Sequence, residues 1–395
     1  MNAPLVIAGA GIGGLTAAVA LSRAGHRVLV LERASALSEV GAGLQLSPNA
    51  CKCLDKIGVL EAVRKTASAP EAIRIRSARS GKALAHIPLG SEASARYGAP
   101  YLLSHRADLQ KALYDKARSL PSVEVRFGHS FIGSHVDEAG NLSVTFQADD
   151  GRNLTLQAKA LVGADGVWSR VRETLREHAT AKFSGRTAYR ATLRADQVDP
   201  GLLRDTGLWL GKDAHIVHYP IRQQSAFNIV VLVAEDWNEQ DWSAPADRIS
   251  LLKRFAQWAP DARRLLETPD SWLKWALCGV PATGPWAQGK TVLIGDAAHA
   301  MLPFAAQGAA MAIEDALVLA SVLTPETTDI ADALCRFERQ RRERVRKVQK
   351  TAEENGRIYH MSGPLALGRD TVLRMSSPES LSARMDWIYG WTPPS

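Results

Sequence analysis

The sequence predicts an α/β fold: a doubly wound, mostly parallel sheet, an inserted strand-rich domain and a helical C-terminal region. Residues 5–33 read as an apolar strand, a glycine-rich turn, a helix and a second apolar strand. Several short runs within residues 187–280 alternate polar and apolar side chains, as half-buried strands do. Apolar residues at helical spacing follow from 334 to 352.

The first unit has the features of a dinucleotide-binding turn. Gly9, Gly11 and Gly14 have the spacing G-x-G-x-x-G between the strand and the helix. The first glycine allows a tight turn, the second allows a pyrophosphate to approach the backbone, and the third lets the helix lie close to the sheet. Glu32 follows the second strand, where its carboxylate would accept hydrogen bonds from a ribose. The unit predicts a Rossmann-like domain.

A signal peptide or a membrane span is the alternative for the same stretch, because residues 1–22 carry no charged side chain. No Lys or Arg precedes the apolar run, and glycines interrupt it. The nucleotide pattern continues through Glu32. We therefore expect a dinucleotide site here and no membrane anchor in the rest of the chain.

The 395 residues are enough for two or three domains with a large core. The four cysteines show neither a CxxC motif nor metal-ligand spacing: Cys51, Cys53, Cys278 and Cys335. Nothing in the sequence marks export, so we expect a reducing cytoplasm and no metal site.

The net charge of +7 raises the question of nucleic-acid binding. The one dense basic run is 336–350, and apolar residues fall on one helical face through it. We expect a solvated helix face rather than a nucleic-acid patch, because no recognised binding module accompanies the run. Attraction of small anionic substrates or of a nicotinamide phosphate is a milder alternative.

A second loop follows the nucleotide unit. Gly41 and Gly43 mark a close approach of the backbone, Gln45 comes next, and Ser47-Pro48 opens a short helix. Residues 73–88 change to short strands around a turn, so the chain leaves the nucleotide domain there.

Acidic residues and glycines recur at later strand ends. Asp165 and Gly166 end an apolar strand, and Asp296 follows another. Gly308 begins a helix whose N-terminus directs N–H groups at an anion or a carbonyl. A doubly wound sheet presents such strand ends to its ligand, although Asp165-Gly166 taken alone is also compatible with a simple turn.

The predicted domains are discontinuous in sequence, and Arg106, before an amphipathic helix, stands where the chain returns to the nucleotide domain. The predicted segments are 1–72, 105–180 and 288–325 for the nucleotide domain, 73–104 and 181–287 for the substrate domain, and 326–395 for the helical C-terminal region.

Three motifs in order resemble a known family. They are GAGIGG with Glu32, ADGVWSRVR at 164–172 and GDAAHAMLP at 295–303. Over essentially its full length the chain resembles the single-component FAD-dependent aromatic hydroxylases, which include salicylate, 3-hydroxybenzoate and 6-hydroxynicotinate hydroxylases. Three ordered motifs are far more specific than any one of them.

The resemblance assigns residues to a FAD site by position. The implied cofactor-binding residues are Gly9, Gly11, Gly14, Glu32, Arg33, Gln45, Arg106, Asp165, Gly166, Asp296, Gly308 and Ala309. Arg106 would reach the phosphates, Asp165 and Gly166 would serve both FAD and the nicotinamide donor, and Asp296 would bind the ribityl chain. Relatives often have Gly-Gln-Gly before the last helix, and Ala306 replaces the first of these glycines here.

The resemblance also implies a reaction. No second G-x-G-x-x-G follows an apolar strand, so NADH or NADPH would bind only transiently on the flavin domain. It would reduce FAD, oxygen would add to give a flavin hydroperoxide, and the distal oxygen would attack a small phenolic ring. A flavin reductase or oxidase without oxygen transfer and a non-catalytic flavin sensor are the alternatives. The expected partners are O2, the aromatic substrate and a second copy in a homodimer, with no nucleic acid or membrane.

The substrate residues are predicted from HIVHYP at 215–220. Period-two alternation puts His215, Val217 and Tyr219 on one strand face and His218 on the other. His215 would accept the proton of a substrate phenol, and Tyr219 would hydrogen-bond the substrate carboxylate or hydroxyl. The alternative is that backbone neighbours satisfy both side chains in a purely structural role.

Overall fold

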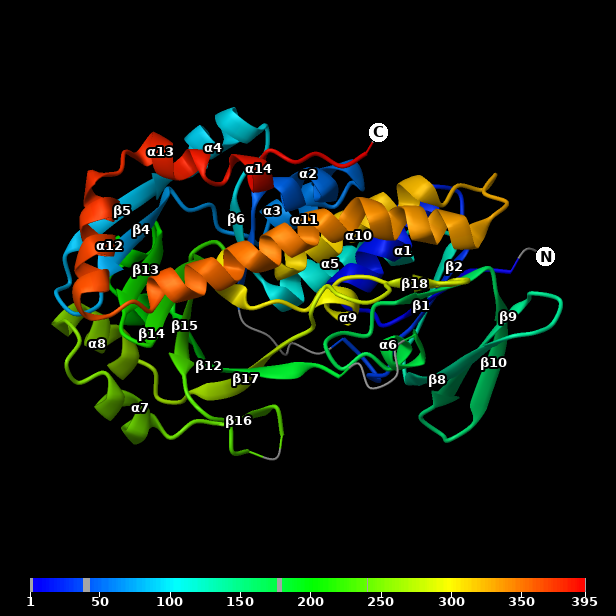
Figure 1. Cartoon of the computed structure of the whole chain (residues 1–395), viewed down its shortest axis with the longest axis horizontal. Coiled ribbons are helices and arrows are strands. Elements are labelled where there is room, and N and C mark those ends of the chain that lie inside the picture. Colours follow the sequence, from blue (N-terminus) through cyan, green and yellow to red (C-terminus); the bar gives the residue numbers. More distant parts are fainter. Residues whose placement is uncertain (1–2, 38–42, 176–179, 240, 395) are drawn as a thin grey trace.

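A computed structural model describes residues 3–37, 43–175, 180–239 and 241–394 of the chain. Two large sheets lie toward opposite ends of an elongated molecule, and helix α11 (Ile330–Tyr359) runs along both of them (Figure 1). At 1.5 Å per residue, a helix of this length extends about 45 Å. It therefore links the two halves of the protein.

The first sheet is the predicted doubly wound sheet. Its strands are, in spatial order, β18 (Ala287–Gln288), β19 (Thr291–Leu293), β11 (Ala160–Gly163), β1 (Leu5–Ala8), β2 (Val28–Leu31) and β7 (Val123–Arg126). All neighbours are parallel except β18, which runs antiparallel to β19 at the edge. Ala8 is level with Gly163 and Leu31, so the carboxyl ends of the three central strands meet at one edge. The predicted fold class is confirmed.

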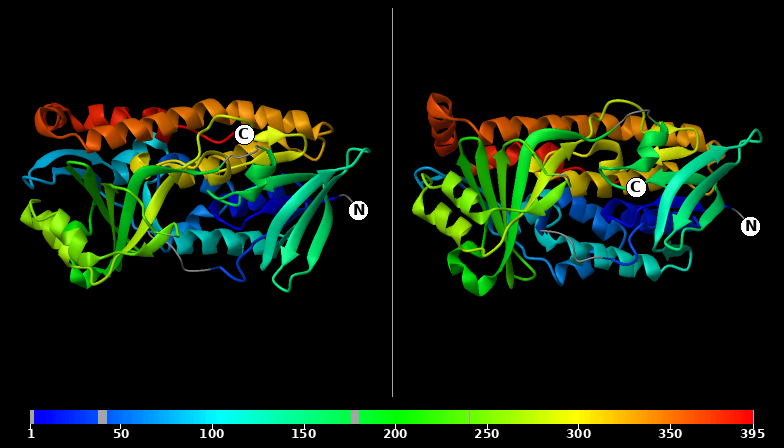
Figure 2. Two further views of the ribbon diagram at one scale, coloured as in Figure 1. Left: turned by 60° about the horizontal axis from the view of Figure 1, so that its bottom comes forward. Right: turned by 90° about the horizontal axis from the view of Figure 1, so that it is seen from below.

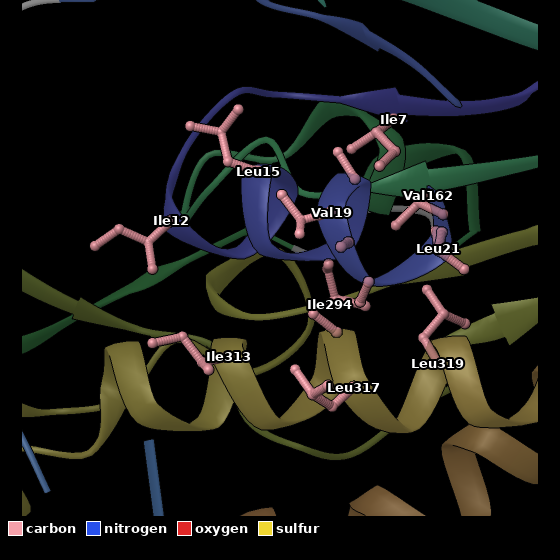
Figure 3. Close-up of a cluster of buried hydrophobic side chains, with 14 of the residues drawn as sticks. Ile7, Ile12, Leu15, Val19, Leu21, Val162, Ile294, Ile313, Leu317 and Leu319 are labelled. Atoms are coloured by element: carbon pink, nitrogen blue, oxygen red, sulfur yellow. The ribbon is translucent and has the colours of Figure 1, made fainter. Parts of the chain in front are cut away.

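Helix α1 (Ile12–Arg23) is buried between this sheet and helix α10 (Gly308–Val322). Figure 3 shows Leu15 and Val19 of α1 among Ile7 of the sheet and Leu317 of α10. An apolar helix covered on two sides has no solvated face, which explains why α1 carries almost no polar residue before its last turn. This packing fixes the start of α1 at the carboxyl edge of the sheet.

The second sheet has eight strands, mostly antiparallel. In spatial order they are β16 (Ser243–Pro245), β17 (Leu273–Gly279), β12 (Lys182–Arg194), β15 (Ala226–Ala234), β14 (Ala214–Ile221), β13 (Thr206–Gly211), β4 (Ala72–Ser77) and β5 (Ala83–Pro88). Helices α7 (Arg248–Arg254) and α8 (Pro260–Glu267) cover one face. The other face is turned toward the first sheet and α11, as Figure 2 shows from two further sides.

Smaller elements complete the chain. One small sheet has three strands, β8 (His129–Val136), β9 (Leu142–Ala148) and β10 (Asn153–Ala158), with β9 in the middle. Another pairs β3 (Gly43–Leu46) with β6 (Leu102–His105). The remaining α-helices are α2 (Pro48–Lys56), α3 (Leu60–Arg64), α4 (Gly90–Tyr97), α5 (Arg106–Arg118), α6 (Arg170–Leu175), α9 (Asp296–His299), α12 (Gly363–Met375), α13 (Pro378–Ala383) and α14 (Asp386–Tyr389). Short 3-10 turns lie at Ala195–Gln197, Pro200–Leu202 and Pro303–Ala305. Gly41, predicted to mark a loop, lies outside the described residues.

Within the described ranges, none of the helices has both the length and the apolar character needed to cross a bilayer.

Candidate active site

A cavity of about 510 Å³ opens between the carboxyl edge of the first sheet and the inner face of the second. Most of the site residues predicted from the sequence line it: Gly9, Gly11, Glu32, Arg33, Gln45, Arg106, Asp165, Gly166, Tyr219, Asp296, Gly308 and Ala309. Gly14 and His215 are not part of its wall. One chamber thus brings together residues from widely separated parts of the chain, between Ala8 and Ala312.

The three glycines of the first turn have different structural roles. Gly9 has a φ of +104°, and a Cβ there would lie 2.5 Å from the carbonyl oxygen of Ala164. A Cβ on Gly14 would lie 2.0 Å from the oxygen of Gly9, so only glycine lets the helix start this close to the strand. A Cβ on Gly11 would meet nothing within 4 Å. Gly11 therefore leaves open space for a ligand, whereas the other two preserve the fold.

Glu32 lies beside this turn and fixes its shape. One carboxylate oxygen accepts a hydrogen bond from the N–H of Ala10 at 2.7 Å, and the other accepts one from the N–H of Ala34 at 2.9 Å. The side-chain amide of Gln110 donates to the oxygen of Ala10 at 2.8 Å. Each carboxylate oxygen retains a second lone pair, which is the acceptor a ribose hydroxyl needs.

The carboxylate of Asp165 caps helix α6. It accepts hydrogen bonds from the hydroxyl of Ser169 and from the N–H groups of Arg170 and Val171, the latter two at 2.8 and 3.1 Å. Burial raises the pKa of Asp165, and these hydrogen bonds oppose that rise. These contacts within the turn satisfy the carboxylate of Asp165 without a ligand. Asp165 and its neighbour Gly166 both line the cavity.

Arg172 joins the loop after β11 to the loop after β19. Its side chain is buried and donates to the carbonyl oxygen of Val167 at 2.7 Å and to that of Ala297 at 3.0 Å. Ala297 directly follows Asp296, an exposed residue that lines the cavity. The two motif loops are thus held side by side.

Ala306, which stands where relatives often have glycine, adopts a backbone conformation typical of glycine. It adopts φ 51° and ψ 34°, which is the left-handed conformation that glycine adopts without strain. The loop before Gly308 therefore keeps a conformation typical of glycine although the residue carries a Cβ. Gly308 itself starts α10, and a Cβ there would meet nothing within 4 Å.

A buried charged network lies behind this loop. Asp315 of α10 accepts from His299 at 2.7 Å and from Arg341 of α11 at 2.7 Å. Arg341 also pairs with Glu314 at 2.7 Å, and Glu314 accepts at 2.7 Å from the amide of Asn49. Burial alone would raise the pKa of Asp315, but His299 and Arg341 together lower it to about 2.

This network corrects the expectation of a solvated face for the basic run at 336–350. The side chain of Arg341 is 1% exposed and that of Arg344 13%, and both pair with Glu314. Arg336, paired with Asp332 at the surface, does fit the expectation. The overlooked signal was the adjacent Glu314-Asp315 in an otherwise apolar helix, because buried carboxylates require cationic partners.

On the second sheet, the predicted alternation of HIVHYP is confirmed by the register. Tyr219 is opposite Asn228, and Val217 is opposite Val230, with both Tyr219 and Val230 in the cavity wall. His218 points to the other face, where its ring lies 5.2 Å from that of Phe227. Burial raises the pKa of Tyr219, so its hydroxyl stays protonated and can donate.

His215 shares the face of Tyr219 but lies in an aromatic cluster. Its ring centroid is 5.5 Å from that of Phe304 and 5.3 Å from that of Tyr359. Opposite it on the neighbouring strand is Leu232, which lines the cavity. Burial, followed by the charges of His360 and Arg186, lowers the pKa of His215 well below its usual value. The imidazole is therefore neutral at physiological pH.

A hydrogen-bond chain assigns the tautomer of His215. The guanidinium of Arg186 can only donate, and it contacts Nδ1 of His360, which must then be the unprotonated nitrogen. Nε2 of His360 carries the proton and lies 2.8 Å from Nδ1 of His215. His215 consequently accepts at Nδ1 and carries its own proton on Nε2.

Comparison with known proteins agrees with this geometry. Residues 2–352 match the FAD binding domain family. The chain is 34% identical to the 3-hydroxybenzoate 6-hydroxylase of Polaromonas naphthalenivorans, over 98% of this chain and 96% of that protein. The chain belongs to the FAD-dependent aromatic hydroxylases. The family resemblance read from the three motifs is thereby confirmed.

A further relative and two solved structures are similar to the chain over nearly their whole length. The 3-amino-4-hydroxybenzoate 2-monooxygenase of Streptomyces platensis is 37% identical, with 98% of this chain and 96% of that protein covered. The structure of a salicylate hydroxylase substrate complex aligns with a TM-score of 0.82 at 27% identity, covering 98% of this chain and 96% of that one. Klebsiella pneumoniae HpxO complexed with FAD and uric acid aligns with a TM-score of 0.83 at 26% identity, covering 97% and 95%.

The residues around the cavity of this hydroxylase fit FAD, its bound cofactor. The open space at Gly11 and the free lone pairs of Glu32 suit the pyrophosphate and ribose. Gly308 and Ala309, at the start of α10, line the same cavity. The individual roles of the site residues stay a prediction.

Proposed function

We propose that this hydroxylase adds one oxygen atom to the ring of a small phenolic acid of the hydroxybenzoate or hydroxypyridine carboxylate type, using NAD(P)H and O2. The observation that supports the proposal is the single chamber, in which the nucleotide-binding turn and Tyr219 of the second sheet line one cavity. Bound FAD supplies the chemistry, because it takes up electrons from NAD(P)H and activates O2. The chain itself supplies orientation, exclusion of water and control of the phenol proton.

Apolar side chains and two polar ones divide these tasks. Val217, Val230 and Leu232 form an apolar wall that excludes water from the reacting ring. We propose that Tyr219 donates a hydrogen bond to the substrate. We propose that His215, next to the cavity-lining Leu232 and with its proton on Nε2, donates a hydrogen bond to the substrate oxygen. This bond favours the ionised phenolate, which is the electron-rich form that reacts.

The decisive experiment is a panel of hydroxybenzoates and hydroxypyridine carboxylates assayed with the purified holoenzyme. NAD(P)H oxidation that rises with the substrate and yields a stoichiometric hydroxylated product supports the proposal. Peroxide alone with every acid identifies an oxidase or reductase instead. A flavin that NADH and NADPH fail to bleach in the presence of ligand identifies a sensor.

Location and assembly are further parts of the proposal. All four cysteines are free thiols, which suits a reducing cytoplasm. A homodimer is proposed because α12 exposes large apolar side chains whose burial would favour association. These are Leu365, Leu367, Val372 and Met375. Light scattering during gel filtration gives the mass that tests the dimer.

A further inference from the structure

We propose that Arg190 is the receptor for the carboxylate of the aromatic substrate. This inference rests on the proposed function and adds a residue that recognises the acid group.

Arg190 lies on the cavity face of the second sheet. It belongs to β12, is opposite Val230 in the register with β15, and lines the chamber together with Val230 and Tyr219. The charge of Arg190 acts electrostatically on the Tyr219 hydroxyl, so the two groups are near neighbours. A ring held at this part of the cavity wall would lie close to both.

The guanidinium of Arg190 has no anionic partner in the described ranges of the chain. Its Nε is buried and makes no hydrogen bond, and neither an ion pair nor a side-chain hydrogen bond involves the residue there. Arg341, by contrast, is buried against Glu314 and Asp315. Arg190 as a residue is only half-buried, but the burial around its guanidinium lowers its pKa, because the charge is partly removed from water. An anion bound in the cavity would supply the opposite charge that the guanidinium lacks.

Trp275 fixes the orientation of the group. The guanidinium carbon of Arg190 lies 5.2 Å from the centroid of the Trp275 ring, within the range of a cation–π contact. A stacked guanidinium keeps its edge available for two parallel hydrogen bonds, and a carboxylate has the matching two oxygens. The arrangement therefore suits a carboxylate better than a neutral group.

The phosphates of the cofactor are the competing anion, because the charge of Arg106 also reaches Arg190. The N-terminus of α1 with Gly9 and Gly11 provides a phosphate site of its own on the first sheet. Arg190 belongs instead to the second sheet, beside the apolar wall where the substrate ring is proposed to lie. We therefore assign it to the substrate.

The test compares acids with their neutral amides in Arg190→Gln and Arg190→Lys holoenzymes. The probes are 3-hydroxybenzoate, salicylate and 6-hydroxynicotinate, each with its carboxamide, and the readouts are perturbation of the flavin spectrum and titration calorimetry. Arg194→Gln is the matched control, because Arg194 is an exposed arginine of the same strand. Binding is measured without NAD(P)H, so turnover is not needed.

We expect Arg190→Gln to weaken binding of the acid about 10- to 100-fold and binding of the amide at most twofold. Arg190→Lys, which keeps the charge but loses the paired donors, should fall between, and it decides the outcome if the Gln variant does not fold. Equal losses for acid and amide, loss of FAD from either variant, or failure of every acid to bind the parent enzyme would overturn the assignment. Arg190-dependent binding of an acid without any hydroxylated product would leave the assignment standing and disprove the proposed function.

Discussion

At the scale of single residues, backbone conformation and open space explain the site better than residue type alone. Ala306 occupies a left-handed conformation, and Gly11 faces space that no atom of the described chain fills within 4 Å. At Ala306 the Cβ is present and strains the backbone, whereas at Gly11 a Cβ would enter open space. Each leads to a test that separates a structural from a ligand-binding role.

Replacing Ala306 with glycine should stabilise the protein. A Cβ in the left-handed region costs about 1–2 kcal/mol, and the greater chain entropy of unfolded glycine offsets about half of the gain. We expect the free energy of unfolding in urea to rise by about 0.5–1 kcal/mol. Ala320→Gly in α10 is the control and should lower it by about 1 kcal/mol, because that residue is helical. A lower stability of Ala306→Gly would contradict the strain argument.

Replacing Gly11 with valine should abolish FAD binding while the chain still folds. The new side chain would enter open space, so it blocks the cofactor without striking the protein. Gly14→Ala should instead lower the melting temperature of the FAD-free protein, because its Cβ strikes the oxygen of Gly9. Flavin absorbance and circular dichroism of both variants check the distinction. A yellow Gly11→Val protein with the parent affinity for FAD would contradict the assigned pyrophosphate site.

At the scale of elements, helices α10 and α11 are joined through buried charges. Glu314 and Asp315 of α10 face Arg341 of α11, and all three side chains are at most 1% exposed. Asp315 also pairs with His299, the last residue of α9, the short helix that Asp296 begins. The contact between α10 and α11 therefore supports the segment from Gly295 to His299, which contains the cavity-lining Asp296.

Removal of the central cation should be strongly destabilising. Arg341→Met would remove the cation that the two buried carboxylates share, leaving Glu314 with Arg344 and Asp315 with His299, at a cost of about 3–5 kcal/mol. Arg336→Met on the same helix breaks only an exposed pair and should cost less than about 1 kcal/mol. Urea unfolding at pH 7 gives both values. Equal small effects would mean that the network contributes little to stability.

The sequence predicted the local parts of this architecture and missed the network. The strand, turn and helix around Gly9 depend on neighbouring residues, so their spacing alone identifies them. The pairing of Arg341 with Glu314 joins residues 27 positions apart on different helices, and no local pattern encodes it. Arg190 was missed for a similar reason, since an arginine in a strand shows its lack of a partner only after folding.

At the scale of the whole molecule, α11 connects the two sheets. Its middle holds Arg341 against the helices of the first sheet. Its C-terminal cap is His360, which contacts His215 of the second sheet. One rigid helix thus supports the cofactor side of the cavity and sets the tautomer on the substrate side.

This arrangement predicts that His215 acts as a donor rather than as a base. Its lowered pKa makes it a weak base, and its proton is on Nε2 because Nδ1 accepts from His360. His215→Ala should bind FAD normally and lose about 100-fold in hydroxylation, with residual activity rising at higher pH as the phenol ionises unaided. His215→Gln retains an N–H donor but cannot take up a proton, so it should recover part of the loss.

The pH dependence and a matched variant complete the test. Because the folded pKa of His215 lies below its unfolded value, the unfolded chain binds the proton more readily. The stability that His215 contributes is therefore fully present above about pH 6.5 and is lost as the pH falls below it.

His218→Gln, on the opposite face of the same strand, reports the effect of removing any buried histidine there. If His215→Gln is as inactive as His215→Ala while His218→Gln hydroxylates at the parent rate, His215 removes the proton itself, and the tautomer assigned through Arg186 and His360 is wrong.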